Sequence, residues 1–193
     1  MSAQGKAATA NGGQITLVGQ DITLASGSTT SAKGGANGGQ INVWSSLQTT
    51  IAGTLNATGG VNGGNGGSIE TSSVGTLNIL GSTTVNVSAP MGIKGNWLLD
   101  PDDMVMDAAT ATVITSALAN ANVTIAVSGN LTINADATIA ASSVGTTLTL
   151  LAADTITNSG TVSTSGLNLS STNVTLAVGS TTNSNQTYKL YEG

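Results

Sequence analysis

Short runs in which apolar and polar residues alternate make up most of the chain, and three of them begin alike. Gly-Gly-Gln-Ile occupies residues 12–15 and 38–41, and Gly-Gly-Ser-Ile occupies residues 66–69, so the signal returns after 26 and then 28 residues. Alternation is the period of a half-buried β-strand, and recurrence at such an interval is typical of stacked repeats. The pattern predicts coils of about 20–28 residues, each beginning at a glycine pair.

The alternation continues beyond the third glycine pair. Apolar positions of this kind lie in residues 55–57, 77–79, 85–87, 104–106, 123–127, 131–133, 148–150, 167–169, 174–178 and, as a terminal strand, 187–191. Many short strands separated by Gly, Asn or Ser turns indicate an all-β chain, and the coil length indicates a parallel β-helix. Ile, Val and Leu would stack inward as ladders, with Thr and Asn outward. About eight coils would give a rod roughly 40 Å long.

A β-sandwich is the alternative all-β architecture, and hairpins joining the strands would favour it. The sequence places no two-residue Asn-Gly turn between paired strands, so the β-helix is the stronger interpretation. The glycine-dense segment of residues 59–67 is expected to turn tightly, with positive φ at several positions.

One stretch interrupts the strand pattern. Pro90 and Pro101 bracket residues 91–100, and a proline restricts the residue before it to extended geometry, so a corner or strand end is expected there. Residues 108–120 have apolar positions three and four residues apart, which predicts one short helix. Asp107 or Thr110 would cap its N-terminus, and Asn120 or Asn122 would end it.

The whole chain is interpreted as a single β-helix domain of residues 1–193. Residues 1–89 form glycine-rich coils, residues 90–122 contain the corner and the helix, and residues 123–193 form further coils.

The composition argues against nucleic-acid binding and against a membrane-spanning helix. Charged residues make up only 7% of the chain and the net charge is −5; there is no His, and all four cations are lysines, namely Lys6, Lys33, Lys94 and Lys189. A chain with so few cations and only four aromatic rings has neither the positive field nor the stacking surface that nucleic acids require. No apolar run approaches the ~20 residues of a membrane-spanning helix.

Two features bear on cellular location. The chain contains no Cys, which is compatible with an exported bacterial surface protein. The first ten residues have no apolar segment of the kind found in a secretory signal. We therefore expect the sequence to be a segment of a longer, exported precursor.

Three motifs together resemble a known family. The segment Gly-Gly-Ser-Ile-Glu-Thr-Ser at residues 66–72 is followed by Gly95-Asn96-Trp97-Leu98-Leu99-Asp100-Pro101 and by Ile-x-x-Ala-Leu at residues 114–118. This order is similar to that of the filamentous-haemagglutinin-like adhesins, large surface proteins of Gram-negative bacteria exported by two-partner secretion, and the resemblance extends over most of residues 12–178. It implies a right-handed parallel β-helical shaft acting in adhesion, aggregation or biofilm, at the cell surface or secreted. The family-motif residues are Gly95, Trp97, Leu98, Leu99, Asp100 and Pro101.

Asp100, Asp102, Asp103 and Asp107 form the only acidic cluster of the sequence. Two carboxylates can perform glycosidic chemistry, but β-helix enzymes that cleave acidic polysaccharides also use Arg, Lys or His, and Lys94 is the only cation nearby. Asp100, Asp102 and Asp103 are weak candidates for Ca²⁺ ligands. A turn at residues 100–103 and a helix cap at Asp107 are the favoured interpretation, with no catalytic residue and no cofactor.

Three remaining features have a structural and a functional interpretation. The glycine loops lack the following Lys and helix of a phosphate site and are taken as turns. Trp97 is expected to pack at a corner, with its N–H bonded locally, whereas Trp44 stays open between packing and a carbohydrate platform. Thr147, Thr149, Thr155 and Thr157 raise the less favoured possibility of an ice-binding array.

The expected protein is a non-enzymatic rod. Its expected partners are further β-helix coils or copies of itself, joined end to end through unpaired backbone, and host or matrix glycans, with neither nucleic acid nor membrane insertion. A self-assembling filament subunit is the alternative function.

Overall fold

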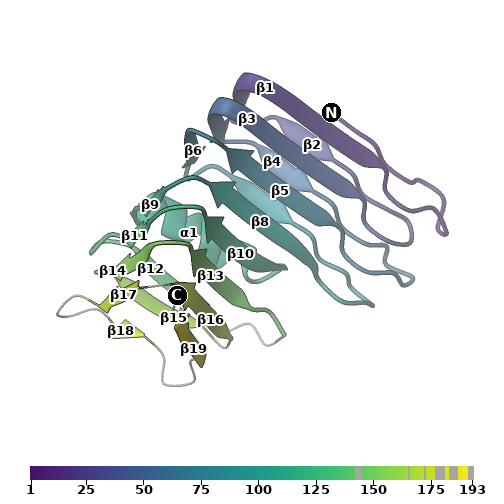
Figure 1. The fold of residues 1–193 in the computed structure, drawn as a ribbon. Coiled ribbons are helices and arrows are strands. Elements are labelled where there is room, and N and C mark those ends of the chain that lie inside the picture. Colours follow the sequence, from purple (N-terminus) through teal and green to yellow (C-terminus); the bar gives the residue numbers. More distant parts are fainter. Residues whose placement is uncertain (142–144, 165, 172, 177–180, 183–186, 191–193) are drawn as a thin grey trace.

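The computed structural model describes residues 1–141, 145–164, 166–171, 173–176, 181–182 and 187–190. Its strands stack in parallel as a β-solenoid of about six turns that contains one short helix (Figure 1). The parallel β-helix expected from the sequence is therefore confirmed, and the β-sandwich alternative is wrong because successive strands pair in parallel rather than as hairpins.

The main sheet is a stack with one strand from each coil. In order, it contains β1 (Gln14–Leu24), β3 (Gln40–Ile51), β5 (Ser68–Ser73), β8 (Gly95–Pro101), β10 (Ala121–Val127), β13 (Leu148–Ala152), β16 (Leu167–Ser171) and β19 (Thr187–Leu190), with β6 (Thr76–Ile79) also paired to β3. The sequence predicted about eight coils. The main-sheet path contains eight strands, but the solenoid has only about six turns.

Three smaller sheets close the other sides of the solenoid. They consist of β2 (Thr29–Ser31), β4 (Thr54–Asn56) and β7 (Thr84–Asn86); of β9 (Met104–Met106), β11 (Leu131–Ile133), β14 (Thr155–Asn158) and β17 (Asn173–Leu176); and of β12 (Thr138–Ala141), β15 (Thr161–Thr164) and β18 (Thr181–Thr182). Val178 and Tyr191, which the sequence assigned to the last strands, lie outside the described residues.

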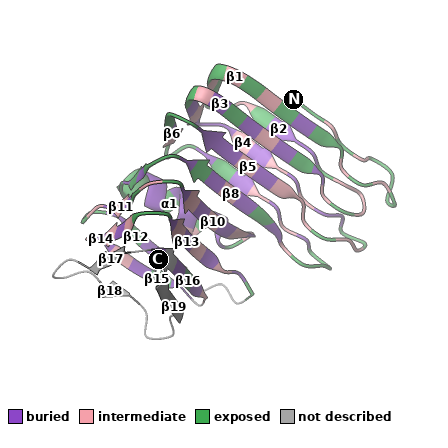
Figure 2. Ribbon diagram, in the orientation of Figure 1, coloured by how far each residue is buried: buried purple, intermediate pink, exposed green. Residues whose placement is uncertain are grey.

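The interior is built from ladders of side chains in register. One runs along the main sheet through Ile15, Ile41, Ile69, Trp97, Val123, Leu148 and Leu167. All of these side chains are buried, and burial alternates along the strands as expected (Figure 2). Between this ladder and the next, an outward column of polar residues includes Thr16, Asn42 and Glu70.

The helix α1 (Ala108–Ala117) takes the place of a strand on the third side of the fourth coil, where it touches β7 and packs on β12. Of the two residues that the sequence offers as its N-cap, Asp107 caps the helix, and Thr110 donates its backbone N–H to the Asp107 side chain. The helix ends earlier than the expected residue 120. The amides of Ala119 and Asn120 donate to Ser116 and Ala117, three residues back, so the chain tightens into a turn there.

Coils before α1 are joined through projecting loops, here called the arms: residues 4–12, 33–38, 58–66 and 88–94. Backbone hydrogen bonds close the bases of the last three arms: Gly39 N–H donates to Ala32 C=O (2.7 Å), Gly67 N–H to Ala57 C=O (2.8 Å) and Gly95 N–H to Val87 C=O (2.8 Å). The arms lie side by side along one edge of the stack (Figure 1). Of the glycines in residues 59–67, Gly63 and Gly64 have the expected positive φ.

The glycine pairs themselves have a different role from the expected bend. A Cβ built on Gly38 would lie 2.0 Å from the carbonyl oxygen of Ala57 in the next coil, and one on Gly66 would lie 1.9 Å from that of Val87. Neither glycine has positive φ. Glycine is needed here because the backbones of adjacent coils approach too closely for any side chain.

Candidate functional site

The family-like motif coincides with one strand. Residues Gly95 to Pro101 are the whole of β8, and their side chains are alternately buried and exposed. Gly95 closes the base of an arm, and a Cβ there would lie 1.9 Å from the Gly67 carbonyl oxygen. Trp97 and Leu99 enter the interior ladders, while Pro101 is buried at the strand end. Most of the motif therefore has a structural role.

Trp97 is packed, as expected, but it lies within a strand rather than at a corner. Its side chain is fully buried in the ladder between Ile69 and Val123. The indole Nε1–H donates to Thr71 Oγ1 at 3.1 Å, and the Thr71 hydroxyl itself donates to the carbonyl of Leu98 at 3.3 Å. A buried indole N–H needs such an acceptor, so the burial of Trp97 depends on a threonine one coil earlier.

The acidic turn is engaged by the following coil. Asp102 Oδ1 accepts from the hydroxyl of Ser128 at 3.0 Å, and Asp103 Oδ1 accepts from the backbone N–H of Asn130 at 2.6 Å. These bonds join the turn after β8 to the turn after β10. Within the described residues, no three His, Cys, Asp or Glu side chains are grouped closely enough to hold a metal ion.

The pKa values of Asp100 and Asp107 are shifted in opposite directions. Partial burial, followed by the charges of Glu70 and Asp102, raises the pKa of Asp100 above its usual value. Glu70 itself accepts a hydrogen bond from the Ser72 hydroxyl at 2.8 Å. Hydrogen bonds from Thr110, whose N–H lies 2.8 Å from Asp107 Oδ1, lower the pKa of Asp107.

Trp44 lies on the outer face of the main sheet and is 41% exposed, beside Val18 on β1 in register. Outward threonines form columns on the smaller sheets, where Thr29, Thr54 and Thr84 are in register on one. Thr138, Thr161 and Thr181 are in register on another. On the main sheet the column is interrupted, because Thr124 and Thr149 are followed by Asn168. Among the described residues, no helix is long and apolar enough to cross a membrane.

An asparagine ladder organises the arms, and sequence reasoning missed it. Asn11 Oδ1 accepts from the N–H of Asn37 (3.1 Å), Asn37 Oδ1 from that of Asn65 (2.8 Å), and Asn65 Oδ1 from that of Ile93 (3.0 Å). The signal was present, because an Asn precedes the glycine pair at residues 11, 37 and 65.

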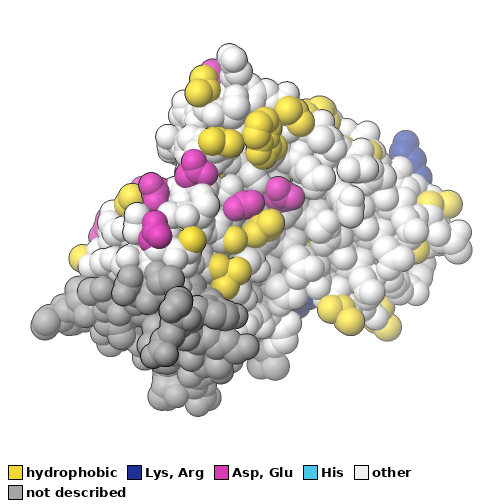
Figure 3. Space-filling view, viewed as in Figure 1, with side chains coloured by type: hydrophobic (Ala, Val, Ile, Leu, Met, Phe, Trp, Pro, Cys, Tyr) yellow, Lys and Arg dark blue, Asp and Glu magenta, His cyan; other side chains and the backbone are white. Residues whose placement is uncertain are grey.

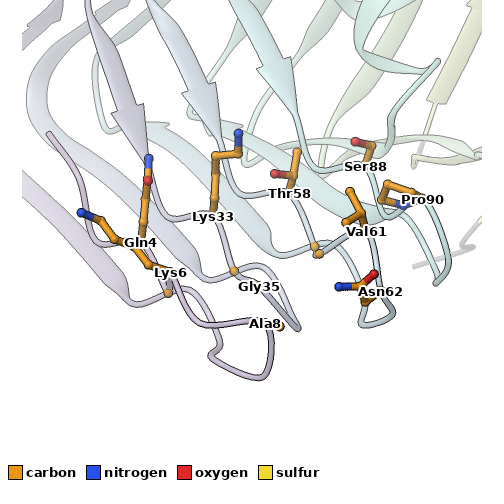
Figure 4. A pocket seen from close by; sticks show the side chains of 14 residues that line it. Gln4, Lys6, Ala8, Lys33, Gly35, Thr58, Val61, Asn62, Ser88 and Pro90 are labelled. Carbon is orange, nitrogen blue, oxygen red and sulfur yellow. The ribbon is translucent and has the colours of Figure 1, made fainter.

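A groove of about 500 Å³ runs across the arms, over the first residues of each arm (Figure 4). Gly5 N–H donates to Lys33 C=O (2.8 Å), Gly34 N–H to Thr58 C=O (3.0 Å) and Gly59 N–H to Ser88 C=O (2.9 Å). Parallel pairing of this kind brings side chains of successive coils into one column. Its members are Gln4, Lys33, Thr58 and Ser88, and Figure 4 shows them in a row.

Charge is unequally distributed between this groove and the rest of the molecule. Lys6 and Lys33 line the groove, and Lys94 lies in the last arm, whereas the four arms contain no Asp or Glu. Acidic side chains instead gather on the face that Figure 3 presents, while a lysine lies at its far margin. The groove is therefore a cationic, donor-rich strip on an acidic protein.

The fold and this groove define a parallel β-solenoid with a polar surface strip across its coils. Searches of models of known protein families, of curated proteins and of solved structures found no match to the chain.

Proposed function

We propose that the chain is a non-enzymatic extracellular rod, part of the shaft of a filamentous-haemagglutinin-like surface adhesin that acts in adhesion, aggregation or biofilm formation. The β-solenoid is compatible with a structural rod. The observation that carries the proposal is the coincidence of the motif of residues 95–101 with β8, inside an unbroken ladder that extends from Ile15 to Leu167.

The contacts of the aspartates support a role without catalysis. Asp102 and Asp103 are used to join consecutive turns, and Asp107 to cap α1. The sequence has no His or Arg to bind the carboxylates of an acidic substrate. An Asp102→Asn variant is therefore expected to change stability rather than to abolish a turnover.

The test of the proposal is adhesion. Beads coated with the purified chain are expected to adhere to glycan-coated surfaces or to one another more than beads coated with albumin. Coated beads indistinguishable from the albumin control contradict the proposal. Turnover of a polysaccharide that Asp102→Asn abolishes would replace it with an enzyme.

A self-assembling filament subunit is the second candidate, and the outer edge of β1 favours it. Gln40 N–H donates to Gly13 C=O at 3.0 Å, so in a parallel pair Gln14 and Thr16 direct their backbone groups away from β3. Among the described strands, β1 is the first of the main-sheet path and has a partner on one side. Such an edge can accept a further coil.

Sedimentation velocity separates the two candidates. A filament subunit grows in size with concentration, and Thr16→Pro, which removes an outward backbone donor, is expected to suppress the growth. Thr16→Val keeps the N–H and serves as the control. Concentration-independent sedimentation of the unaltered chain contradicts end-to-end assembly and leaves the adhesive rod.

A further inference from the structure

We propose that the groove across the arms binds a linear anionic polysaccharide, laid along the solenoid axis from Gln4 toward Ser88. The inference rests on the proposed adhesive function, because it names the class of ligand and the place where the rod would hold it.

The spacing suits a polymer with a short repeat. Gln4, Lys33, Thr58 and Ser88 come from consecutive coils, so neighbouring side chains are separated by about one strand spacing of ~4.8 Å, and the column extends for roughly 14 Å. One sugar residue advances an extended polysaccharide by a similar distance. The column therefore offers one polar side chain to each of three or four consecutive sugars.

The groove can donate hydrogen bonds along its length. The Lys33 ammonium is a donor only, and the Thr58 and Ser88 hydroxyls can donate or accept. Gln4 is oriented by its own contact, because its Nε2 donates to Ser31 Oγ at 2.9 Å and its amide oxygen is left for a ligand. Hydroxyl and carboxylate or sulfate groups on a sugar chain match this mixture.

The charge of the groove selects an anion. Lys6 and Lys33 line it, and no acidic residue occurs in any of the four arms, although the whole chain carries −5. A neutral glycan would leave both ammonium groups without an ionic partner. An anionic polymer satisfies them and also gains from counterion release, because condensed ions leave a polyanion when cations bind it.

The margin of the groove is apolar. Val61 and Pro90 line it beside the polar column, and the face of a sugar ring can rest on them. Gly5, Gly34 and Gly59 also line the groove. A Cβ built on each would lie 2.2, 1.7 and 2.5 Å from a backbone oxygen of the same arm, so these glycines serve the packing of the arms.

Isothermal titration calorimetry of the intact chain with polygalacturonate and with chondroitin sulfate tests the proposal, with dextran as the neutral control. Binding to either anionic polymer but not to dextran is expected. Chondroitin sulfate has carboxylates as well as sulfates, so tighter binding of it than of polygalacturonate shows that sulfate adds affinity. The affinity should decrease with salt, with a log–log slope of about −1 to −2 for two lysine contacts. No binding to either polymer, or equal binding to dextran, overturns the proposal.

The matched variants are Lys6→Ala/Lys33→Ala and Lys94→Ala. The double variant should weaken binding at least tenfold, whereas Lys94→Ala, which removes a cation outside the groove lining, should change it by less than about twofold. Thr58→Val should weaken binding about threefold without any change of charge, at the scale of a single net hydrogen bond. Unchanged binding by the double variant, or an equal loss with Lys94→Ala, overturns the groove as the site.

Failure here is distinguishable from failure of the proposed function. A chain that adheres as coated beads, but binds neither polyanion, retains the adhesive rod and loses only the groove. Circular dichroism and melting temperature of each variant establish that a loss of binding is not a loss of fold.

Discussion

The coils before and after α1 share one architecture but differ in how the chain passes from one coil to the next. Ser68 on β5 pairs with Asn96 on β8, 28 residues later, whereas Leu148 on β13 pairs with Leu167 on β16, 19 residues later. Much of the difference lies in the connections: the arm of residues 88–94 precedes β8, but only residues 165 and 166 separate β15 from β16. The interior ladder continues through both regions, so the extra length is not needed to build the core.

This difference indicates where surface function can be located. The arms of the first coils bring Lys6, Lys33 and a column of polar side chains to one edge, without disturbing the ladder beneath them. The coil that begins at β13 spends only two residues on each of its connections. A solenoid can therefore keep one core while varying the connections on one side.

The glycines of the arms provide the largest expected effect. In Gly38→Ala the new Cβ would lie 2.0 Å from the Ala57 carbonyl oxygen, so adjacent coils must separate, and we expect a loss of about 3 kcal/mol or more. In Gly166→Ala, after α1, the nearest atom is at 3.3 Å and a loss below about 1 kcal/mol is expected. Urea unfolding followed by circular dichroism measures both.

A third variant separates crowding from backbone conformation. Gly27 has φ +78° and open space around its Cβ position, so Gly27→Ala should lose only the roughly 1–2 kcal/mol of a left-handed residue. Equal losses for Gly38→Ala and Gly166→Ala would show that the close approach of the arms is not what distinguishes the two regions.

The interior of the two regions also differs, and this gives the next largest effect. One ladder contains Leu17, Val43, Thr71, Leu99, Ile125, Leu150 and Leu169, so that Thr71 is a polar step in an otherwise aliphatic series. Thr71→Val leaves Trp97 Nε1–H without its acceptor, and we expect a loss of about 1–3 kcal/mol in urea unfolding.

The double variant Thr71→Val/Trp97→Phe tests the origin of that loss. Removing the indole together with the hydroxyl leaves no donor unsatisfied, so the double variant should be more stable than the sum of the two single changes predicts. Additive losses would mean that Thr71 stabilises the coil through packing alone. Ile125→Val, at the corresponding step after α1, should cost about 0.5–1.5 kcal/mol as a simple loss of volume.

Much of this architecture is readable from the sequence, because alternation fixes which side chains enter the ladder. Ile15, Ile41 and Ile69 could be assigned inward from their neighbours, and Trp97 joins them in register. The role of Gly38 could not be assigned, because a glycine needed for contact between coils and a glycine needed for a turn look alike in one dimension. The groove was missed for a related reason: Lys6, Lys33 and Thr58 are far apart in sequence, and only the stacking of the arms brings them to one channel.

The smallest expected effects concern two aspartates on either side of the corner before α1, and their pH dependences have opposite signs. The pKa of Asp107 is lowered in the folded state, so its contribution to stability is present above the ordinary Asp value and is lost as the pH decreases through the folded pKa. Asp107→Ala should cost about 1 kcal/mol at pH 7, as the loss of a helix cap, and the difference from the unaltered chain should shrink below about pH 4.

The pKa of Asp100 is raised, so its carboxylate destabilises the folded state above the folded pKa and ceases to do so below the ordinary Asp value. Asp100→Asn should therefore increase stability slightly at pH 7, by less than Asp107→Ala decreases it, and should have no effect in acid. Thermal melts of both variants from pH 3 to 7 measure this. A loss of stability in Asp100→Asn at pH 7 would mean that a favourable contact of the Asp100 carboxylate outweighs its burial and its repulsion from Glu70 and Asp102.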